Sequence, residues 1–401
     1  MGTLVLLESN TTGTGRLFAR AAANLGHEPV LLAADPSRYP YAQEDDIRTV
    51  VIDTSDEDAV LAACNELGDV AGITSSSEYF IAPAARVAAA LGLPGPDADA
   101  IGRCRDKEAQ RNVLAEARVP IPRFAAASTP EEAVKAAEDI GLPVVLKPVA
   151  GSGSVGVRLC ESADEVRAHA GALLATTVNE RGIPIPARLL VEELALGPEC
   201  SAEVFSGRTV GVVRKHLGEA PWFVETGHDF PAPFPADDIH AVASCARDAA
   251  EALGLGFGPI HAELRLTSRG PRVIEVNPRL AGGNIPELVR HASGVDLVTE
   301  AVRLVVGGRP HLDATRRRHG ALRFLLAPRA GTLHAVNGIE EAAAVDGVVE
   351  VRVTKQPGDA LTRQGDFRDR IGHVLAVADD ADAAAGAAEE ARARITVEAR
   401  D

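Results

Sequence analysis

Two neighbouring segments of the chain alternate between apolar and polar residues, as β-strands with one buried face do. In residues 260–267 (IHAELRLT) every second residue is apolar, and Glu263 falls on the polar face. In residues 273–277 (VIEVN), Glu275 and Asn277 stand two apart and therefore point to one face. The Ser-Arg-Gly-Pro sequence between the segments is typical of a turn. A hairpin folded symmetrically about this arginine would make Glu263 and Glu275 direct cross-strand neighbours.

Two carboxylates paired in this way repel each other unless a cation lies between them. A hard divalent cation removes the repulsion, and the amide oxygen of Asn277 completes an all-oxygen donor set suited to Mg²⁺. The alternative is a solvated hairpin face that happens to carry two acids. Arg279, followed by Gly282 and Gly283, favours the metal, because it adds a fixed cation and a closely approaching backbone beside the acids.

The first 96 residues have the pattern of a doubly wound α/β domain, in which short apolar runs alternate with amphipathic helical segments. The predicted strands are residues 4–7, 29–33, 50–52 and 70–74, and the predicted helices are residues 16–25 and 81–91. Residues 12–15 (TGTG) resemble part of a dinucleotide fingerprint. Phe18 stands where the third glycine would be needed, so a tight turn is favoured over NAD binding.

A second informative stretch begins with a short apolar strand that ends in Lys147. A strand lysine in an apolar setting is usually paired with an anion. Residues 149–157 (VAGSGSVGV) follow as a loop whose backbone N–H groups could fold over phosphates. The loop lacks the Gly-Lys-Ser/Thr of a P-loop, and a flexible surface hairpin is its alternative interpretation.

The rest of the chain continues as strands and helices. Further strands are predicted at residues 189–194, 201–205 and 209–213, before an amphipathic helix at residues 239–253. From about residue 319 the chain again alternates strands and closes with an alanine-rich helix. That last segment has no cluster of catalytic residue types, so we interpret it as a lid or covering domain.

Composition narrows the classes of function. The 401 residues are enough for two or three domains, and 46% apolar with 24% charged residues is ordinary for a globular protein. The net charge of −16, without a long basic run, argues against nucleic acid or an anionic membrane as a partner. The five cysteines have no metal-binding spacing, and no signal peptide or membrane-spanning apolar run is present. We therefore expect a cytoplasmic protein with reduced thiols.

The order of these motifs over residues 97–308 resembles that of the ATP-grasp superfamily. The motifs are Asp106-Lys107, Lys147-Pro148 with its glycine-rich loop, Glu192-Glu193-Leu194, Glu199, Lys215, Glu263 and Glu275-x-Asn277-Pro278-Arg279. Within the superfamily, residues 223–230 (FVETGHDF), residues 277–283 (NPRLAGG) and the C-terminal segment are most similar to the L-amino acid ligases, which join two amino acids. The sequence from Lys215 to residue 221 is instead similar to a stretch of biotin carboxylase.

The resemblance implies a site for ATP. Two lysines would contact the phosphates, the Ser/Gly loop would close over them, and Glu199 would bind the ribose unless it faces solvent. The acidic run that ends in leucine would bind adenine, partly through its backbone. The implied nucleotide-binding residues are Lys107, Lys147, Ser152, Gly153, Ser154, Gly156, Glu192, Glu193, Leu194 and Glu199.

The resemblance also implies a catalytic and substrate site. The metal-binding residues would be Glu263, Glu275 and Asn277, which would hold two Mg²⁺ ions, with Mn²⁺ as a substitute. Lys215 and Arg279 would face the transferring phosphoryl group or the acyl carboxylate.

Four further residues are implied to contact the substrates. Glu225 and His228 would bind or orient an amino acid, although a histidine in such a loop can also be structural. Gly282 and Gly283 stand where a bulkier residue would restrict the pocket. No general base is assigned, and Glu225 and His228 are its candidates.

These observations predict an α/β protein with an α+β ATP-grasp part. We expect a pre-ATP-grasp Rossmann-like domain at residues 1–96 and a first ATP-grasp part with the lid loop at 97–188. A catalytic part with the hairpin follows at 189–315, and a covering domain at 316–401. The expected activity is ADP-forming amide synthesis from a carboxylate and an amine through an acyl phosphate, in a homodimer. The alternative is a related ligase that activates bicarbonate or a carboxylate that is not an amino acid.

Overall fold

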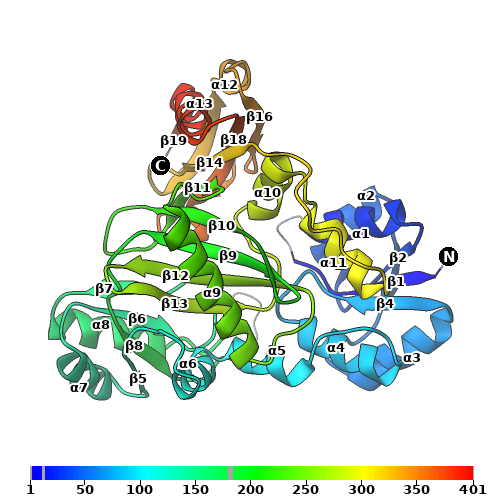
Figure 1. Ribbon diagram of the computed structural model, residues 1–401, viewed down its shortest axis with the longest axis horizontal. Helices are drawn as coiled ribbons and strands as arrows, with labels where there is room; N and C mark the ends of the chain where they lie inside the picture. The colour runs from blue at the N-terminus through cyan, green and yellow to red at the C-terminus, as the bar shows by residue number, and fades with distance from the viewer. Residues whose placement is uncertain (1, 11–13, 179–183, 401) are drawn as a thin grey trace.

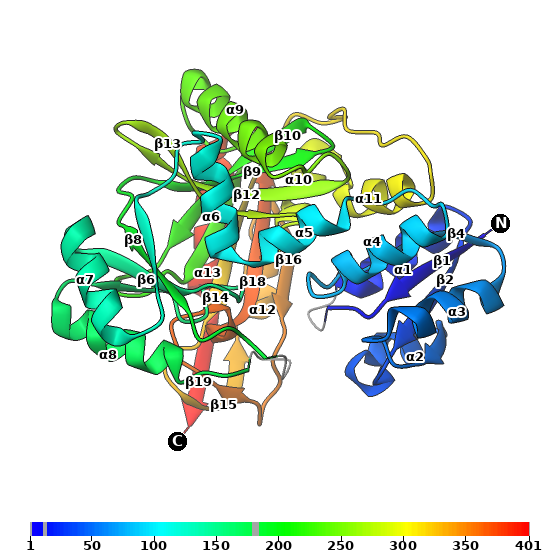
Figure 2. The same cartoon turned by 90° about the horizontal axis from the view of Figure 1, so that it is seen from below.

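The computed structural model describes residues 2–10, 14–178 and 184–400, so most of the TGTG sequence at residues 12–15 lies outside the described residues. The described chain forms four β-sheets with helices packed against them (Figure 1). Seen from below, the N-terminal sheet and a small antiparallel sheet lie on opposite sides of a large sheet (Figure 2).

The N-terminal sheet is parallel, with the strand order β3-β2-β1-β4. Its strands and helices are β1 (Thr3–Leu7), α1 (Thr14–Asn24), β2 (Glu28–Ala33), α2 (Pro40–Glu44), β3 (Arg48–Val51), α3 (Glu57–Leu67), β4 (Val70–Thr74) and α4 (Ile81–Ala90). The apolar strands are buried because helices cover the sheet, as parallel sheets require. The predicted doubly wound domain is confirmed.

The small sheet is antiparallel, with the order β5-β8-β6-β7. Its strands are β5 (Phe124–Ala127), β6 (Val144–Pro148), β7 (Arg158–Cys160) and β8 (Leu189–Glu193), and its helices are α7 (Pro130–Ile140) and α8 (Ala163–Leu174). The helices α5 (Ala98–Arg105) and α6 (Lys107–Glu116) lead into it. Because β8 pairs with β6, the start of the predicted catalytic part at residue 189 belongs to this sheet. The division into four domains stays a prediction.

The large sheet is antiparallel and has eight strands in the order β13-β12-β9-β10-β11-β14-β18-β16. They are β9 (Glu199–Phe205), β10 (Arg208–Leu217), β11 (Glu225–Phe230), β12 (Pro259–Thr267), β13 (Gly270–Asn277), β14 (His319–Leu326), β16 (Val348–Val353) and β18 (Arg370–Ala378). The helix α9 (Ala236–Ala252) packs on the end that holds β12 and β13, and α13 (Ala381–Arg394) on the end that holds β14 and β18. The C-terminal segment therefore extends the sheet that carries the hairpin.

The remaining elements connect or cap these sheets. The helices α10 (Ile285–Ser293) and α11 (Leu297–Val305) link the hairpin to β14, and α11 packs against α1 of the N-terminal region. A third antiparallel sheet contains β15 (Gly331–Asn337), β17 (Ala360–Leu361) and β19 (Thr396–Arg400). The helix α12 (Ile339–Ala343) packs against α13 and β16. Two short 3₁₀ helices are η1 (Pro36–Arg38) and η2 (Phe367–Asp369).

All five cysteines are buried free thiols. Within the described ranges, no helix has the length and apolar character needed to span a membrane.

Candidate functional site

The hairpin places its two glutamates opposite each other, as the sequence predicts. Glu263 on β12 pairs with Glu275 on β13, and His261 pairs with Asn277. Contrary to the prediction from the sequence, however, the hairpin is not symmetric. Leu264 pairs with Val273, so Ile274 has no partner on β12 in this ladder. The skipped residue is a β-bulge, which is a common device next to active sites.

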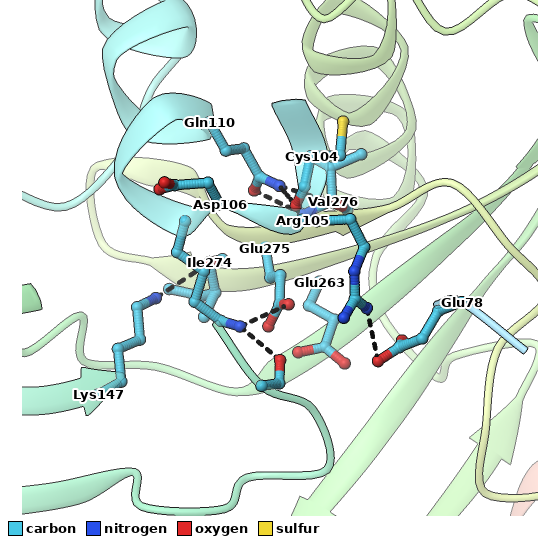
Figure 3. Close-up of polar contacts among 12 residues, drawn as sticks. Glu78, Cys104, Arg105, Asp106, Gln110, Lys147, Glu263, Ile274, Glu275 and Val276 are labelled. Atoms are coloured by element: carbon cyan, nitrogen blue, oxygen red, sulfur yellow. Dashed lines mark hydrogen bonds and ion pairs between the residues drawn. The ribbon is translucent and has the colours of Figure 1, made fainter. Parts of the chain in front are cut away.

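The bulge turns the carbonyl of Ile274 toward two cations. The Lys147 Nζ donates a hydrogen bond to Ile274 O at 3.3 Å (Figure 3). Arg111 Nη2 donates to the same oxygen. Gln110 on α6 holds the next residue, because its side-chain amide exchanges two hydrogen bonds with the backbone of Val276, at 2.8 and 2.9 Å. The edge strand β13 is thereby fixed by side chains where no further strand pairs with it.

The donor set of the hairpin fits a magnesium ion. Glu263 accepts from the Lys215 ammonium at 2.8 Å, and Glu275 lies 3.2 Å from the Lys107 ammonium, so each carboxylate already holds a cation. Together with Asn277 they offer oxygen donors only. No group of three or more His, Cys, Asp or Glu side chains suited to a metal occurs among the described residues. Mg²⁺ takes one or two carboxylates and completes its shell with phosphate oxygens and water, so the two glutamates and Asn277 fit it.

Lys215 lies at the centre of a buried carboxylate cluster. Its Nζ is 2.7 Å from Glu225, 2.8 Å from Glu263 and 3.3 Å from Glu199. Although burial opposes a charge, these acids raise the pKa of Lys215 well above its ordinary value. Arg265 bonds the second oxygen of Glu199 at 3.0 Å. The cluster therefore keeps a fixed positive charge on β10 among three acids that come from β9, β11 and β12.

A second buried ion pair positions Lys147. Its ammonium lies 2.8 Å from Glu192, whose other oxygen accepts from Arg111 at 2.7 Å. Burial and the neighbouring Arg111 lower the pKa of Lys147 to about 8. Glu192 was expected to bind adenine, but its carboxylate is engaged by these two cations, and Arg111 was not assigned a role from the sequence.

The glycine-rich loop lies over this group. Lys107 joins the loop to the hairpin, because its Nζ donates to Gly151 O at 2.7 Å and also contacts Glu275. The loop in turn touches the C-terminal region, since the Phe367 N–H bonds Gly153 O at 3.3 Å. A Cβ on Gly153 would lie 2.4 Å from the Phe367 ring, so only glycine allows this approach.

These side chains surround two adjoining cavities. The small cavity, about 120 Å³, is lined by the predicted residues Lys107, Lys147, Ser152, Gly153, Ser154, Glu192, Glu193, Leu194, Glu199, Glu225, Glu263, Glu275, Asn277 and Arg279. The large cavity, about 510 Å³, lies between this region and the N-terminal sheet. Of the predicted residues it is lined by Ser152, Gly153, Ser154, Glu225, Glu263, Arg279, Gly282 and Gly283. The cavities meet at the lid loop, Glu225, Glu263 and Arg279.

Three predicted residues line neither of these cavities: Gly156, Lys215 and His228. His228 lies behind the wall, with its ring edge-on to Phe324 and its Nε2 3.4 Å from Glu225. Burial lowers its pKa to about 3, so the ring is neutral at pH 7.

Gly282 and Gly283 both line the large cavity but differ in the space that surrounds them. A Cβ on Gly283 would approach His228 Nε2 to 2.7 Å at a φ of +60°, whereas a Cβ on Gly282 would enter open space.

Arg279 is held from the N-terminal region. Its Nε donates to Glu78 at 2.7 Å, and the other oxygen of Glu78 contacts Arg105 at 2.8 Å (Figure 3 shows the second pair). Burial opposes the charge of Glu78, but the two guanidinium groups lower its pKa to about 2. Glu78 follows β4 in a serine-rich loop and gave no signal in the sequence.

His261 supports Glu263 from within the sheet. The imidazole lies 2.8 Å from Glu203 and 3.0 Å from Glu263, and Ser201 donates to Glu203 at 2.7 Å. Although burial opposes its charge, Glu203 raises the pKa of His261 to about 9. The strand alternation already placed His261 on the face of Glu263, which is the one signal that could have found it.

Comparison with family models identifies three consecutive regions. Residues 19–95 match the ATP-grasp N-terminal domain, residues 140–287 the ATP-grasp domain, and residues 323–400 the L-amino acid ligase C-terminal domain 2. An uncharacterized protein of Sinorhizobium fredii is 41% identical over 94% of this chain and 78% of its own length.

Two further proteins connect the chain to ligases of known name. Alanine–anticapsin ligase of Bacillus subtilis is 28% identical over 56% of this chain and 52% of its own length. The crystal structure of an L-amino acid ligase from Bacillus licheniformis superposes with a TM-score of 0.82 at 20% identity, over 100% of this chain and 99% of that one. The predicted family and fold class are confirmed. The chain belongs to the ATP-grasp superfamily, in the group of ADP-forming carbon–nitrogen ligases related to the L-amino acid ligases.

Proposed function

We propose that this protein forms an amide bond between the carboxylate of an amino acid and an amine, with conversion of ATP to ADP and phosphate through an acyl phosphate. The observation that carries the proposal is the junction of the two cavities. The small cavity gathers lysines and paired acids suited to Mg·ATP, and the large cavity has room for two organic substrates. Glu225, Glu263 and Arg279 stand where both meet.

The chemistry requires activation, because a carboxylate and an amine at pH 7 exchange a proton and do not condense. In the proposed first step a carboxylate oxygen attacks the γ-phosphorus of ATP and ADP leaves. Lys107 and Lys147 would bind the phosphates, while Arg279 would offset the charge that spreads over the phosphoryl oxygens. Lys215, which lines neither cavity, would instead hold Glu225 and Glu263 in place. Mg²⁺, held by Glu263, Glu275 and Asn277, would supply further neutralisation of that charge.

In the second step the neutral amine attacks the acyl carbon, phosphate leaves and the amine loses a proton. Water competes for the same intermediate, so the site must close. Ser152, Gly153 and Ser154 line both cavities and would form the lid. The contact between Gly153 and Phe367 would hold this lid against the C-terminal region. Neither candidate is assigned as the general base, because burial lowers the pKa of His228 to about 3 and, although burial opposes its charge, Lys215 and Arg370 lower the pKa of Glu225.

The amino acid would lie in the large cavity against Glu225, Gly282 and Gly283. The carboxylate of Glu225 suits an α-ammonium group, and the open space at Gly282 leaves room for a side chain. The similarity to a protein named alanine–anticapsin ligase supports an amino acid as substrate.

The test is release of ADP and phosphate from Mg·ATP against the twenty amino acids, singly and in all pairs, with mass spectrometry of the products. We expect release that requires two substrates and a product whose mass equals their sum minus water. Glu275→Gln, assayed in parallel, separates the site from contaminating ATPases. Turnover with bicarbonate or with a carboxylate that is not an amino acid, and with no amino acid pair, would contradict the proposal.

A further inference from the structure

One part of the large cavity is lined by apolar side chains from the N-terminal region and from α11. Helix α11 packs against α1 (Figure 1), and both helices contribute apolar residues to the cavity wall. On α11 these are Val298, Ala301 and Val305, which share one helix face because they are three and four residues apart. We call this part the apolar lobe, and it is formed by Leu17, Phe18, Leu280, Val298, Ala301 and Val305.

The apolar lobe is kept free of the charges of α11. Glu300 and Arg303 pair with each other at 3.0 Å, and neither lines the cavity. Leu17 is half-buried, and the other lobe residues are buried members of one core cluster. Protein interiors are close-packed, so an apolar-lined space inside a core is unusual and is the usual form of a ligand pocket. Ala301 is the smallest residue of the lobe, and a larger side chain there would narrow the space.

The apolar lobe adjoins the place of the proposed reaction. Leu280 directly follows Arg279, which lines both cavities. The acyl donor would direct its carboxylate toward ATP in the small cavity and lie against Gly282 and Gly283. The amine must then approach the acyl carbon from the large cavity, because the phosphoryl group occupies the small one. The apolar lobe is therefore available to the group that the amine carries.

We propose that the amine substrate carries an apolar group, which fills the apolar lobe. The inference rests on the proposed function and names the chemical class of its second substrate. Transfer of an apolar group from water into such a space is favourable in proportion to the area buried. A polar group would lose its hydrogen bonds to water there, since the side chains of the lobe offer none in return.

The test varies the amine donor while the acyl donor is fixed. Alanine, norvaline and norleucine form a series of increasing length, and glutamine is a polar counterpart of norleucine. With wild-type enzyme, kcat/KM should rise by roughly 4-fold for each added methylene group. Norleucine should exceed glutamine by about 10-fold or more, because glutamine would bury an amide without a partner.

Two variants change the size of the apolar lobe in opposite directions. Ala301→Leu should lower kcat/KM for norleucine by roughly 10- to 100-fold and leave the value for alanine nearly unchanged. Leu17→Ala, at a half-buried position, should shift the preference from norleucine to 2-aminoheptanoate, which is longer by one methylene group. The KM for ATP should not move in either variant. Ala23→Leu is the matched control, since Ala23 is exposed on α1 and lines neither cavity, and it should behave as wild type.

Three results would overturn the inference. One is a wild-type enzyme that uses glutamine or alanine as well as norleucine. Another is a Leu17→Ala enzyme with wild-type preferences, which decides the question even if Ala301→Leu does not fold. The third is a dependence on chain length that follows the acyl donor, because the apolar lobe would then hold the other substrate. Absence of amide product with every pair would instead overturn the proposed function.

Discussion

The small and large cavities are built in different ways. Most of the charged side chains of the small cavity stand on strands, with Lys147 on β6, Glu192 on β8, Glu263 on β12 and Glu275 on β13. The wall of the large cavity comes from strand ends and connections in the N-terminal, central and C-terminal regions. A strand fixes side-chain direction through its period of two, whereas a loop depends on the tertiary contacts that hold it. The charges of the small cavity should therefore tolerate little change, and the large cavity should accept more.

The largest expected effect is at the hairpin. Glu275→Ala should reduce Mg·ATP turnover by about 10³-fold or more, because a metal-held carboxylate supports several kcal/mol of transition-state stabilisation. Steady-state ADP release measures the loss, and circular dichroism checks the fold. Glu340→Ala on the exposed face of α12 is the control and should retain full activity. Near-full activity of Glu275→Ala would contradict the metal assignment.

Next in size is the buried pair of the small cavity. Glu192→Gln leaves Lys147 and Arg111 without their shared carboxylate, which should cost roughly 3–5 kcal/mol of the free energy of unfolding. Glu193→Gln, the next residue on β8, removes an acid from half-exposed pairs and should cost less than about 1 kcal/mol. Urea denaturation measures both. Equal losses in the two variants would show that the buried pair carries no special stability.

A smaller, pH-dependent effect is expected at the large cavity. Because the pKa of Glu78 is lowered to about 2 in the folded state, its contribution to stability is present above its ordinary pKa near 4.5 and is lost as the pH falls toward 2. Glu78→Gln should therefore be less stable than wild type by roughly 3 kcal/mol at pH 7. The difference should shrink below about pH 4.5.

Denaturation at several pH values measures this difference. Glu57→Gln, which removes an exposed pair with Arg86, is the control and should show little dependence. A gap of constant size from pH 7 to pH 3 would contradict the assigned ion pairs.

The smallest effect is expected at Gly282, where the wall of the large cavity leaves open space. Gly282→Leu should fill space and lower kcat/KM for large acyl donors by roughly 10- to 100-fold relative to small ones, with the KM for ATP unchanged. Gly386→Leu on the exposed face of α13 controls for a new apolar side chain. Competition between a small and a large acyl donor measures the shift. A uniform loss across donors would place Gly282 away from the bound side chain.

The sequence predicted the small cavity better than the large one for a physical reason. Alternation and a turn signal predicted that Glu263 pairs with Glu275, and the bulge at Ile274 preserves that pairing. An apolar strand that ends in lysine predicted an anion partner for Lys147, and Glu192 is that anion. These predictions needed only local periodicity and charge.

The residues that the sequence did not reveal act across long separations. Glu78 reaches Arg279 from the loop that follows β4 of the N-terminal sheet, and Arg370 reaches Glu225 from the C-terminal region. No local pattern encodes a contact between segments so far apart. For Glu192, the motif predicted that the residue belongs to the site, but it did not predict that Arg111 and Lys147 both bind its carboxylate.

The skipped residue in the hairpin has an evolutionary consequence. A chain that lost Ile274 would still align Glu275 with Glu263, because the neighbouring pair of Leu264 and Val273 would continue directly into it. It would lose the carbonyl that Lys147 and Arg111 share. A one-residue deletion at this point would thus spare the acids and uncouple them from Lys147, the lysine proposed to bind phosphate. We therefore expect a change of length in this hairpin to alter the proposed nucleotide binding and to leave the proposed metal ligands in place.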